Sequence, residues 1–346
     1  MINRTKMVLA AAAAALLVAP ASWAQLSSYS QNFEAIALGT PIPNAALGAA
    51  GFLVSGVVYD GDTGTSPPYG TQKFFYGTFP APNGPVAFSG VVAGQSGIPQ
   101  GLQVLNVFSD YQCCTGNGPE GHFDGTAPND FVQSNVFRQQ TIGLANIGTT
   151  WSFKFDAKAN TVDGCATAAG SDCVAYIQTV SGSTVTNLIT FDAQTLTANW
   201  STHNISIDLS DPLLNGQVLQ FGFQSTSQLF GNTGVYYDNI FFGVDADADG
   251  APNIADNCRL VANNTGAGAQ ADSDADGFGN RCDGDFNNNT VVNSQDYVLF
   301  RQQLGQPSDA PVFNRADINA NGVVNSQDYV LFRGLLGSPP GPGAGP

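Results

Sequence analysis

Four stretches near the C-terminal end of the chain repeat one pattern of Asp and Asn within a twelve-residue segment. Each stretch carries an oxygen-bearing side chain at its first, third, fifth, ninth and twelfth positions, and three of the four have Gly at the sixth. Ca²⁺ prefers six to eight oxygen ligands, and loops of this length supply them at these positions, with a main-chain carbonyl at the seventh. The pattern therefore predicts four calcium-binding loops. Without a cation the carboxylates of each loop would repel one another, so we expect the loops to become ordered only when metal binds.

The predicted ligands can be named for each loop. Those of the first loop are Asp245, Asp247, Asp249, Ala251, Asn253 and Asp256, and those of the second are Asp272, Asp274, Asp276, Phe278, Asn280 and Asp283. Those of the third loop are Asp285, Asn287, Asn289, Val291, Asn293 and Asp296, and those of the fourth are Asp317, Asn319, Asn321, Val323, Asn325 and Asp328. In the third loop Thr290 replaces the glycine and only two ligands are carboxylates, so we expect this loop to bind calcium more weakly than the first two. The alternative is an acidic, flexible linker.

The first two loops end in Asp and are not followed by a helical pattern, so they are not paired calcium-sensor loops. Residues 245–284, with Asp256-Asn257-Cys258 and Gly279-Asn280-Arg281-Cys282-Asp283, resemble thrombospondin type 3 repeats. That resemblance implies a compact, calcium-stabilised stalk with Cys258 and Cys282 in disulfides. Arg259 departs from the family, which usually has Pro at this position.

An eleven-residue segment, Val291 to Arg301, recurs without change as Val323 to Arg333. Each copy is predicted to lead from a calcium loop into a short helix whose apolar residues are Val298, Leu299 and Phe300, or Val330, Leu331 and Phe332. Residues 285–337 resemble a type I dockerin, and residues 338–346 form a Gly/Pro tail. The resemblance implies a cohesin-like protein partner, recognised through Ser294, Gln295, Ser326 and Gln327. Equally, the pair could be a calcium-stabilised C-terminal module without a cohesin.

Residues 25–244 have a different character, rich in Gly, Ser, Thr, Val and Phe and predicted to be almost entirely β-structure. Apolar residues alternate or cluster in short runs that are separated by Gly, Asn and Ser turns. The runs predict strands around 52–59, 74–76, 102–108, 151–155, 174–180, 188–191, 205–209, 219–223 and 235–242. About ten such strands favour a two-sheet jelly-roll β-sandwich, which makes the chain mainly β with a small α pair at its end.

Three segments mark the edges of this body: Gln31-Asn32-Phe33-Glu34, Trp200 to Leu209 and Val235 to Phe242. They resemble the edges of galactose-binding-like jelly rolls, the fold of many carbohydrate-binding modules. The resemblance implies a structural calcium held by Glu34 and Asp238, and a sugar site built from exposed aromatic rings. Candidates for stacking on a sugar are Tyr59, Tyr69, Tyr111 and Tyr236, and the alternative for each is packing in the core or at an edge. Trp151 and Trp200 are expected in the core.

The N-terminus predicts export. Arg4 and Lys6 precede an apolar run and the triplet Ser22-Trp23-Ala24, as in a secretory signal peptide over residues 1–24, and no later segment is long enough to span a membrane. The six cysteines are then expected in an oxidising compartment. Pairing Cys165 with Cys173 and Cys258 with Cys282 is one of the 15 possible connectivities, and it leaves the adjacent Cys113 and Cys114. A net charge of −16 argues against nucleic acid as a partner.

Catalytic residues are sparse. Asp110, Glu120, Asp124 and Asp130 lie near His122 and could contain the carboxylate pair that a glycosidase needs, but no catalytic motif surrounds them. We therefore expect a secreted, noncatalytic calcium-binding protein with a glycan-binding sandwich that acts in polysaccharide binding or degradation. A secreted glycoside hydrolase or lyase, and a calcium-dependent adhesion or matrix protein, are the alternatives.

Overall fold

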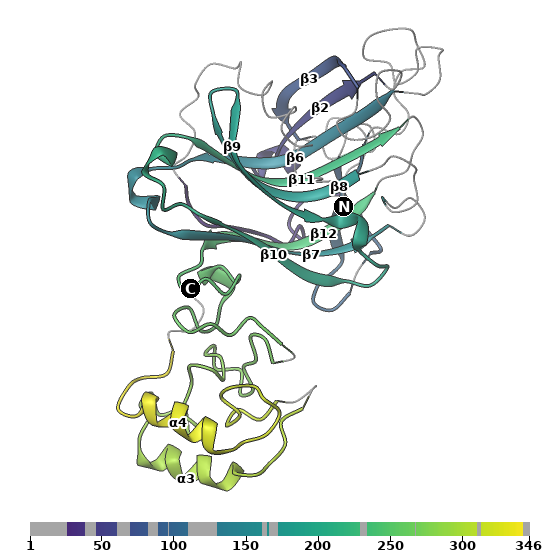
Figure 1. The fold of residues 1–346 in the computed structure, drawn as a ribbon. Helices are drawn as coiled ribbons and strands as arrows, with labels where there is room; N and C mark the ends of the chain where they lie inside the picture. Colours follow the sequence, from purple (N-terminus) through teal and green to yellow (C-terminus); the bar gives the residue numbers. More distant parts are fainter. Residues whose placement is uncertain are drawn as a thin grey trace. The chain divides into compact units, whose positions relative to one another are not determined.

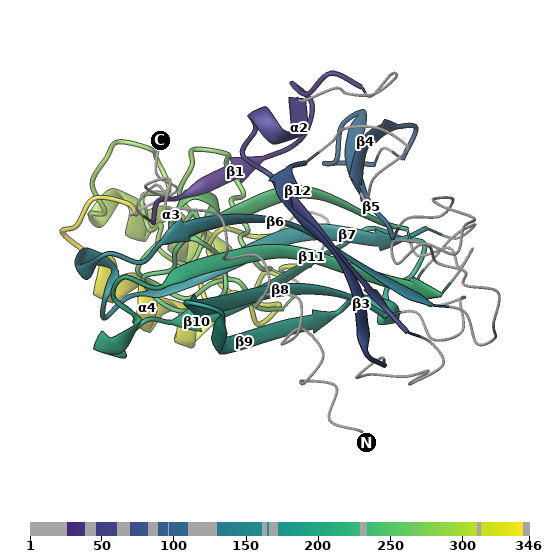
Figure 2. The same ribbon diagram turned by 90° about the horizontal axis from the view of Figure 1, so that it is seen from above.

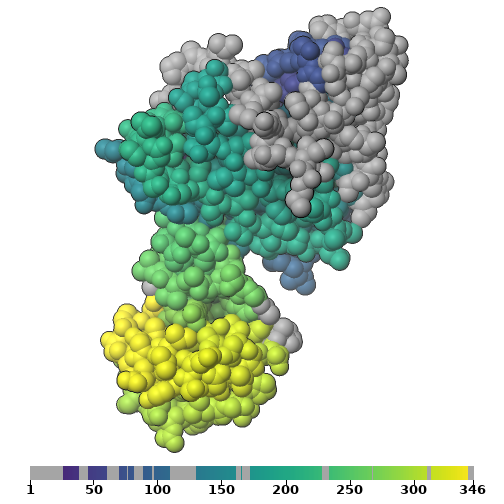
Figure 3. Space-filling model, viewed as in Figure 1, coloured from purple at the N-terminus to yellow at the C-terminus, as the bar shows by residue number. Residues whose placement is uncertain are grey.

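The computed structural model describes residues 26–38, 46–60, 70–81, 89–95, 97–109, 130–160, 165, 172–228, 234–266, 268–309 and 313–341. Figure 3 shows the remaining residues in grey. The predicted signal peptide, Tyr69, Tyr111, Cys113, Cys114 and the acids at 110, 120 and 124 lie outside the described residues. The chain divides into two compact units, Met1–Gly148 with Phe153–Ile240, and Thr149–Ser152 with Phe241–Pro346.

Two β-sheets face each other in the first unit (Figure 1). The first sheet is antiparallel, with the strand order β3-β2-β6-β11-β8-β9. Its strands are β2 (Leu53–Tyr59), β3 (Gln72–Pro80), β6 (Phe131–Thr141), β8 (Asp172–Ser181), β9 (Thr184–Asp192) and β11 (Val218–Gln228). The second sheet has the order β10-β7-β12-β5-β4, and β1 pairs with β12. Its strands are β1 (Tyr29–Gln31), β4 (Ser89–Ala93), β5 (Gln103–Val107), β7 (Thr150–Ala159), β10 (Ser201–Asp208) and β12 (Val235–Val244).

Aromatic side chains fill the space between the sheets. Phe153 of β7 lies 5.2 Å from Phe221 and 5.4 Å from Phe223 of β11, measured between ring centroids. Tyr237 of β12 stacks on Phe223 at 3.6 Å. Because side chains alternate across a strand, the residues between these aromatics point to the outer faces of the sheets. The predicted mainly β sandwich is confirmed.

Short helices occupy the connections. They are α2 (Ala46–Ala49) and the single 3₁₀ turns η2 (Leu144–Asn146), η3 (Ala193–Thr195), η4 (Pro212–Leu214) and η5 (Asn253–Ala255). Asp192 and Asp211 cap η3 and η4 by accepting hydrogen bonds from the main-chain N–H two residues on. Among the described residues, no helix has the length and apolar character needed to cross a bilayer.

The second unit ends in two helices, α3 (Ser294–Gln303) and α4 (Ser326–Leu335), as the duplication predicts. Their core contains Phe300 and Phe332, whose rings stack at 5.2 Å, together with Phe286 from the third calcium loop. Val298 and Val330 were expected in this apolar group, but they are 54% and 66% exposed. Each lies two residues before the buried phenylalanine, which at 100° per residue turns it away from the core.

The structure contains the disulfides Cys165–Cys173 and Cys258–Cys282, with Cα–Cα distances of 6.1 and 5.6 Å. Both pairs are those considered from the sequence. Cys282 is the eleventh residue of the second calcium loop, and Cys258 follows the first loop by two residues. The second bond therefore joins the two loops of the thrombospondin-like segment.

Candidate calcium centres and a polar sheet face

The four predicted calcium loops share one main-chain conformation. The fourth residue of each has a positive φ, at 61° in Ala248, 59° in Ala275, 55° in Asn288 and 55° in Ala320. The sixth residue does too, at 94° in Gly250, 95° in Gly277, 75° in Thr290 and 93° in Gly322. Residues other than glycine rarely adopt positive φ. The same turn at the same two positions shows that the spacing of Asp and Asn encodes one loop structure four times.

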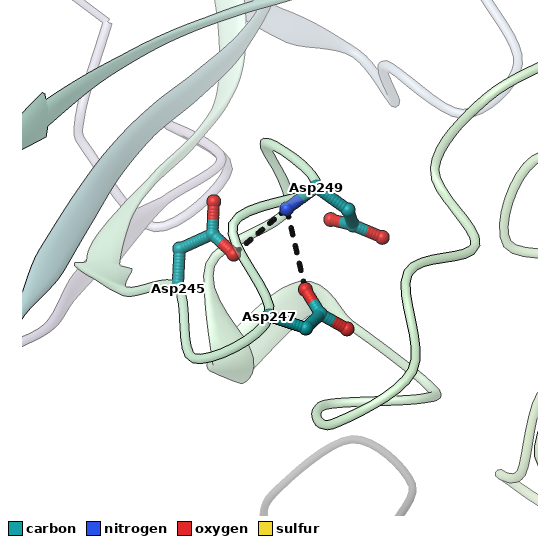
Figure 4. A group of neighbouring side chains, drawn as sticks. All are labelled: Asp245, Asp247 and Asp249. Carbon is teal, nitrogen blue, oxygen red and sulfur yellow. Dashed lines mark hydrogen bonds between the residues drawn. The ribbon is translucent and has the colours of Figure 1, made fainter.

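The carboxylate at the first position organises each loop. It accepts a hydrogen bond from the main-chain N–H at the sixth position in all four loops: Gly250 to Asp245, Gly277 to Asp272, Thr290 to Asp285 and Gly322 to Asp317. Figure 4 shows the first loop, where the N–H of Asp249 donates to Asp245 at 3.2 Å and to Asp247 at 3.3 Å. The side chains at the first, third and fifth positions are thereby drawn together.

Two groups of three carboxylates result, Asp245 with Asp247 and Asp249, and Asp272 with Asp274 and Asp276. In each group one oxygen per residue lies within 4.8 Å of those of the other two. The third and fourth loops have Asn at two of these positions. The spacing of Asp at the first, third and fifth positions therefore brings three carboxylates together in each of the first two loops, and these two loops carry the higher charge.

Buried carboxylates in the first two loops make these loops suitable for a cation. Burial, followed by the charges of neighbouring aspartates, raises the pKa of Asp247 to about 6 and that of Asp283 to about 7. Asp247 Oδ2, Asp256 Oδ2 and Asp272 Oδ1 are buried and have no hydrogen-bond partner among the described residues. A buried acceptor without a partner is costly, and a divalent cation removes both that cost and the repulsion. The residues present fit calcium, since all of them offer oxygen.

In the third and fourth loops the predicted ligands also cap a helix. Asn293 Oδ1 accepts from the N–H of Gln295 at 2.8 Å, and Asp296 Oδ2 accepts from the N–H of Asn293 at 2.8 Å. Asn325 and Asp328 repeat the arrangement at the start of α4. The ninth and twelfth loop positions thus form a reciprocal capping box, which satisfies main-chain donors at the beginning of each helix.

Arg315 links the second loop to the C-terminal helical module. Its guanidinium forms an ion pair with Asp274 at 2.5 Å, donates to the carbonyl oxygen of Phe286 and lies 5.3 Å from the centroid of the Phe286 ring. Ser273 Oγ donates to the carbonyl of Phe313 at 2.7 Å. A predicted ligand of the second loop is therefore in direct contact with the dockerin-like segment.

Glu34 and Asp238, the predicted calcium pair of the sandwich, lie in one polar cluster. Glu34 Oε1 accepts from the N–H groups of Leu102 at 2.7 Å and Gln103 at 2.8 Å. Asp238 is fully buried, and its Oδ2 has no partner within the described ranges. Burial, with the charges of Asp156 and Glu34, raises the pKa of Asp238 to about 7 against the opposing hydrogen bond from the Asn239 N–H. The oxygens of Glu34 and Asp238 are ligands of the kind that calcium prefers, but among the described residues they do not belong to a group of three close carboxylates like those of the first two loops.

A band of amide side chains lies on the outer face of the first sheet, the face that points away from the aromatic core. Gln178 of β8 donates to Gln220 of β11 at 2.7 Å, and Gln220 donates to Gln139 of β6 at 2.8 Å. Further along the same two strands, Gln133 of β6 donates to Gln224 of β11 at 2.7 Å. In Figure 2 the first sheet lies nearest the viewer, with β6, β11 and β8 side by side.

Three buried polar atoms in this band have no partner among the residues that the structure describes. They are Gln133 Oε1, Asn135 Nδ2 and Gln178 Oε1, and the three side chains are 0%, 3% and 3% exposed. Native proteins leave few buried polar groups unpaired, so a set of three on one face needs an explanation. The apolar patterns used to predict the strands gave no indication of this band. A signal was present in the sequence, since Gln or Asn occupies positions 133, 135 and 139 on one alternating face and positions 220 and 224 on another, with Phe137 and Gly222 between them.

The predicted sugar-stacking tyrosines have different surroundings. Tyr59 is 5% exposed and packs with Val57, Phe131 and Phe75, and burial raises its pKa to about 12. Its ring is therefore part of an apolar cluster and not an exposed platform. Tyr236 is half-buried on β12, and Lys158 Nζ lies 5.6 Å from its ring centroid and 5.1 Å from that of Trp200. Trp200, expected in the core, is also only half-buried.

Asp130, one of the four acids considered for catalysis, is 2% exposed and forms an ion pair with Lys73 at 2.7 Å. A buried carboxylate that is paired in this way holds β3 against the start of β6. The other three acids and His122 lie outside the described residues.

Two segments of the chain match family models. Residues 283–336 match the dockerin type I domain, and residues 244–265 match the thrombospondin type 3 repeat. Both resemblances predicted from the sequence are confirmed for these segments, and both families bind calcium. No curated protein matches the chain at a significant level.

The sandwich is loosely similar to several solved structures. The active domain of tailspike protein 4 from bacteriophage CBA120 has 11% identity and a TM-score of 0.34, over 60% of this chain and 21% of its own. A carbohydrate-binding module of the β-sandwich superfamily has 15% identity and a TM-score of 0.33, over 64% of this chain and 63% of its own. The CBM22-1 xylan-binding domain of Paenibacillus barcinonensis Xyn10C has 10% identity and a TM-score of 0.27, over 46% of this chain and 83% of its own. This chain thus spans about a fifth of the tailspike domain and less than two thirds of the first binding module. TM-scores of this size carry no information about a ligand.

Proposed function

We propose that this chain is an exported, noncatalytic protein whose sandwich binds a polysaccharide and whose C-terminal segments are held together by calcium. The match to the dockerin type I family supports docking to a cohesin-like protein, with Ser294, Gln295, Ser326 and Gln327 on the recognition surface. Such a protein would work outside the cell, bringing a glycan and a protein assembly together.

The observation that carries the glycan proposal is the amide band with its unpaired atoms. A sugar hydroxyl both donates and accepts, and the band contains acceptors in Gln133 and Gln178 and a donor in Asn135 that have no partner among the described residues. Binding sites of small molecules pair such convergent polar groups with apolar and aromatic surroundings. Tyr176 and Phe137 both pair with Gly222 on the same face, and both rings are buried beneath the surface of the sheet. A neutral polysaccharide is the ligand that this set of uncharged amides fits best.

Replacing Asn135 by Leu tests this site in the full chain. Leu keeps the shape of the side chain and removes a buried donor that has no partner, so we expect an unchanged or higher unfolding midpoint. Affinity should fall about fivefold or more, the loss expected for one hydrogen bond of roughly 1 kcal/mol. Affinity electrophoresis in gels that contain neutral or uronate-bearing polysaccharides measures the binding.

Gln140→Leu is the matched control. Gln140 is 4% exposed like its neighbours, but its Oε1 accepts from the N–H of Ser27 at 2.7 Å. This variant should lose stability and keep its affinity. If Tyr236→Ala abolishes binding and Asn135→Leu does not, the glycan site lies on the other sheet. If no polysaccharide retards the wild-type chain, the glycan proposal is wrong and a protein ligand, as in an adhesion protein, takes its place.

We further propose that calcium occupies the four loops through the residues named for each, and a fifth position between Glu34 and Asp238. Bound metal would supply positive charge that pairs the buried aspartate oxygens and fixes the loop turns. Equilibrium dialysis should therefore find up to five calcium ions per chain, and Asp238→Asn should remove one of them.

A further inference from the structure

The four calcium loops differ from one another in a correlated way. In the first two, the third and fifth positions are aspartates, and the eleventh is Ala255 or Cys282. In the last two, the third and fifth positions are asparagines and the eleventh is Gln295 or Gln327. Glutamine therefore occurs at the eleventh position only where the ligands at the third and fifth positions are amides.

The structure shows a direct contact between these residues, repeated in both loops. Gln295 Oε1 accepts from Asn287 Nδ2 and Asn289 Nδ2, each at 3.3 Å. In the fourth loop, Gln327 Oε1 accepts from Asn319 Nδ2 at 3.4 Å and Asn321 Nδ2 at 3.0 Å. One glutamine oxygen thus draws the two asparagine NH₂ groups of its loop toward itself.

The opposite end of the amide is held by the loop main chain. Asn289 Oδ1 accepts from the N–H of Val291 at 3.1 Å, and Asn321 Oδ1 accepts from the N–H of Val323 at 3.2 Å. Asp249 Oδ1 accepts the equivalent bond in the first loop, from Ala251 at 2.8 Å. The asparagine oxygen therefore occupies the place that a carboxylate oxygen takes in the aspartate loops.

An amide and a carboxylate differ in what they offer a cation. A carboxylate has two oxygens, so either orientation of the group presents an acceptor, whereas an amide turned by 180° presents an NH₂ group that repels a cation. A residue that accepts from that NH₂ group selects the orientation in which oxygen is available. Such supporting hydrogen bonds commonly orient metal ligands.

We propose that Gln295 and Gln327 are positioning residues of the third and fourth calcium loops, which keep the oxygens of the asparagine ligands available to the metal. The inference rests on the proposed calcium binding of these loops. It gives the two glutamines a role inside the loop, separate from any contact with a docking partner.

Calcium titration of the full chain, followed by NMR, tests the proposal loop by loop. The main-chain amides of Thr290 and Gly322 donate to the first carboxylate of the third and fourth loops and report on each separately. In Gln327→Ala, the calcium affinity of the fourth loop should fall about 10- to 100-fold, as when an outer partner of a metal ligand is lost. The third loop, left unchanged, is the internal control. Gln327→Glu keeps an accepting oxygen and should bind calcium at least as well as the wild type.

The decisive variant places Gln327→Ala in a chain that also carries Asn319→Asp and Asn321→Asp. Carboxylates need no orienting partner, so here the loss of Gln327 should leave the affinity of the fourth loop unchanged. An equal fall in both backgrounds would mean that Gln327 supports the fold of the loop in some other way, and no fall in the asparagine background would overturn the proposal outright. If neither loop of the wild type binds calcium, the proposed calcium binding of the third and fourth loops is itself wrong.

Discussion

At the scale of single residues, the geometry of the calcium loops depends on two positions with positive φ. Glycine takes the sixth position in three loops, and the third loop has Thr290 there with φ at 75°. For a β-branched residue this conformation is a strained one. The strain is visible in the sequence as the single departure from the glycine pattern, and the structure shows that the loop keeps its shape despite it.

Thr290→Gly should therefore stabilise the second unit by about 1 kcal/mol, the cost of a left-handed conformation for a residue with a side chain. Thermal unfolding of the calcium-loaded protein measures the difference. The reverse substitution at the equivalent position of the fourth loop is Gly322→Thr. A Cβ at Gly322 would meet its nearest atom, Ser308 O, at 3.8 Å, so there is room for a side chain and only main-chain strain should destabilise this variant. If Thr290→Gly lowers the unfolding midpoint instead, the threonine side chain stabilises the loop by more than its strained φ costs.

At the scale of elements, the pattern of apolar residues located five of the six strands of the first sheet and four of the six strands of the second. The missed strands are β1, β4 and β6. In β6, Gln133 and Asn135 point to the outer face, while Ser134 Oγ on the inner side donates to the carbonyl of Phe108 at 2.8 Å. A strand with buried polar groups on both faces has no apolar period to detect. One of the two central strands of the first sheet was therefore not predicted, because the residues of the amide band interrupt its apolar pattern.

The calcium loops show the opposite case, because their ligand spacing alone fixes which residues meet. What spacing could not predict is the protonation of the metal-free loops, which depends on burial in the folded chain. Asp283 and Asp247 have pKa values of about 7 and about 6, well above the ordinary value. Burial and the charges of neighbouring carboxylates raise these two pKa values, and both causes arise only when the chain has folded.

In the metal-free protein the second unit should therefore lose stability as the pH rises from about 4 to about 7. The folded state binds more protons than the unfolded state across this window, so the free energy of unfolding falls with pH. With calcium the trend should reverse, since the metal needs deprotonated carboxylates. Thermal midpoints at pH 5 and pH 8, with chelator and with calcium, give the comparison. Asp283→Asn should flatten the metal-free dependence, and a metal-free midpoint that climbs with pH would contradict the assignment.

At the scale of the whole molecule, each of the two compact units is stabilised internally by a different kind of interaction. The sandwich has an aromatic core between two sheets, whereas the calcium loops of the second unit bury aspartates, including Asp245, Asp256 and Asp283, at 2% exposure or less. The apolar contacts of that unit include the ring pair Trp151–Phe242 and the cluster around Phe286, and its four loops lie outside a continuous aromatic core of the kind found in the sandwich. Its stability should follow the concentration of calcium.

A chelator should lower the unfolding midpoint of the second unit far more than that of the sandwich. Metal that binds only the folded state contributes about 2.7 kcal/mol per site at a hundredfold excess over its dissociation constant. The four proposed sites in the second unit and the one proposed site in the first would give unequal shifts. Scanning calorimetry of the full chain resolves the two transitions, and Glu34→Gln should abolish the smaller shift. Equal shifts, or none, would contradict the claim that bound calcium stabilises the second unit.

The contacts of Arg315 determine where a fragment should begin if the C-terminal helices of this chain are to be fused to another protein. The family match begins at residue 283, yet the guanidinium that lies against Phe286 is neutralised by Asp274, which precedes that start. A fragment cut at 283 would leave an arginine with its counter-ion gone at the edge of a small core. The portable piece of this protein should instead begin before Asp272, so that the second loop travels with the helices it touches.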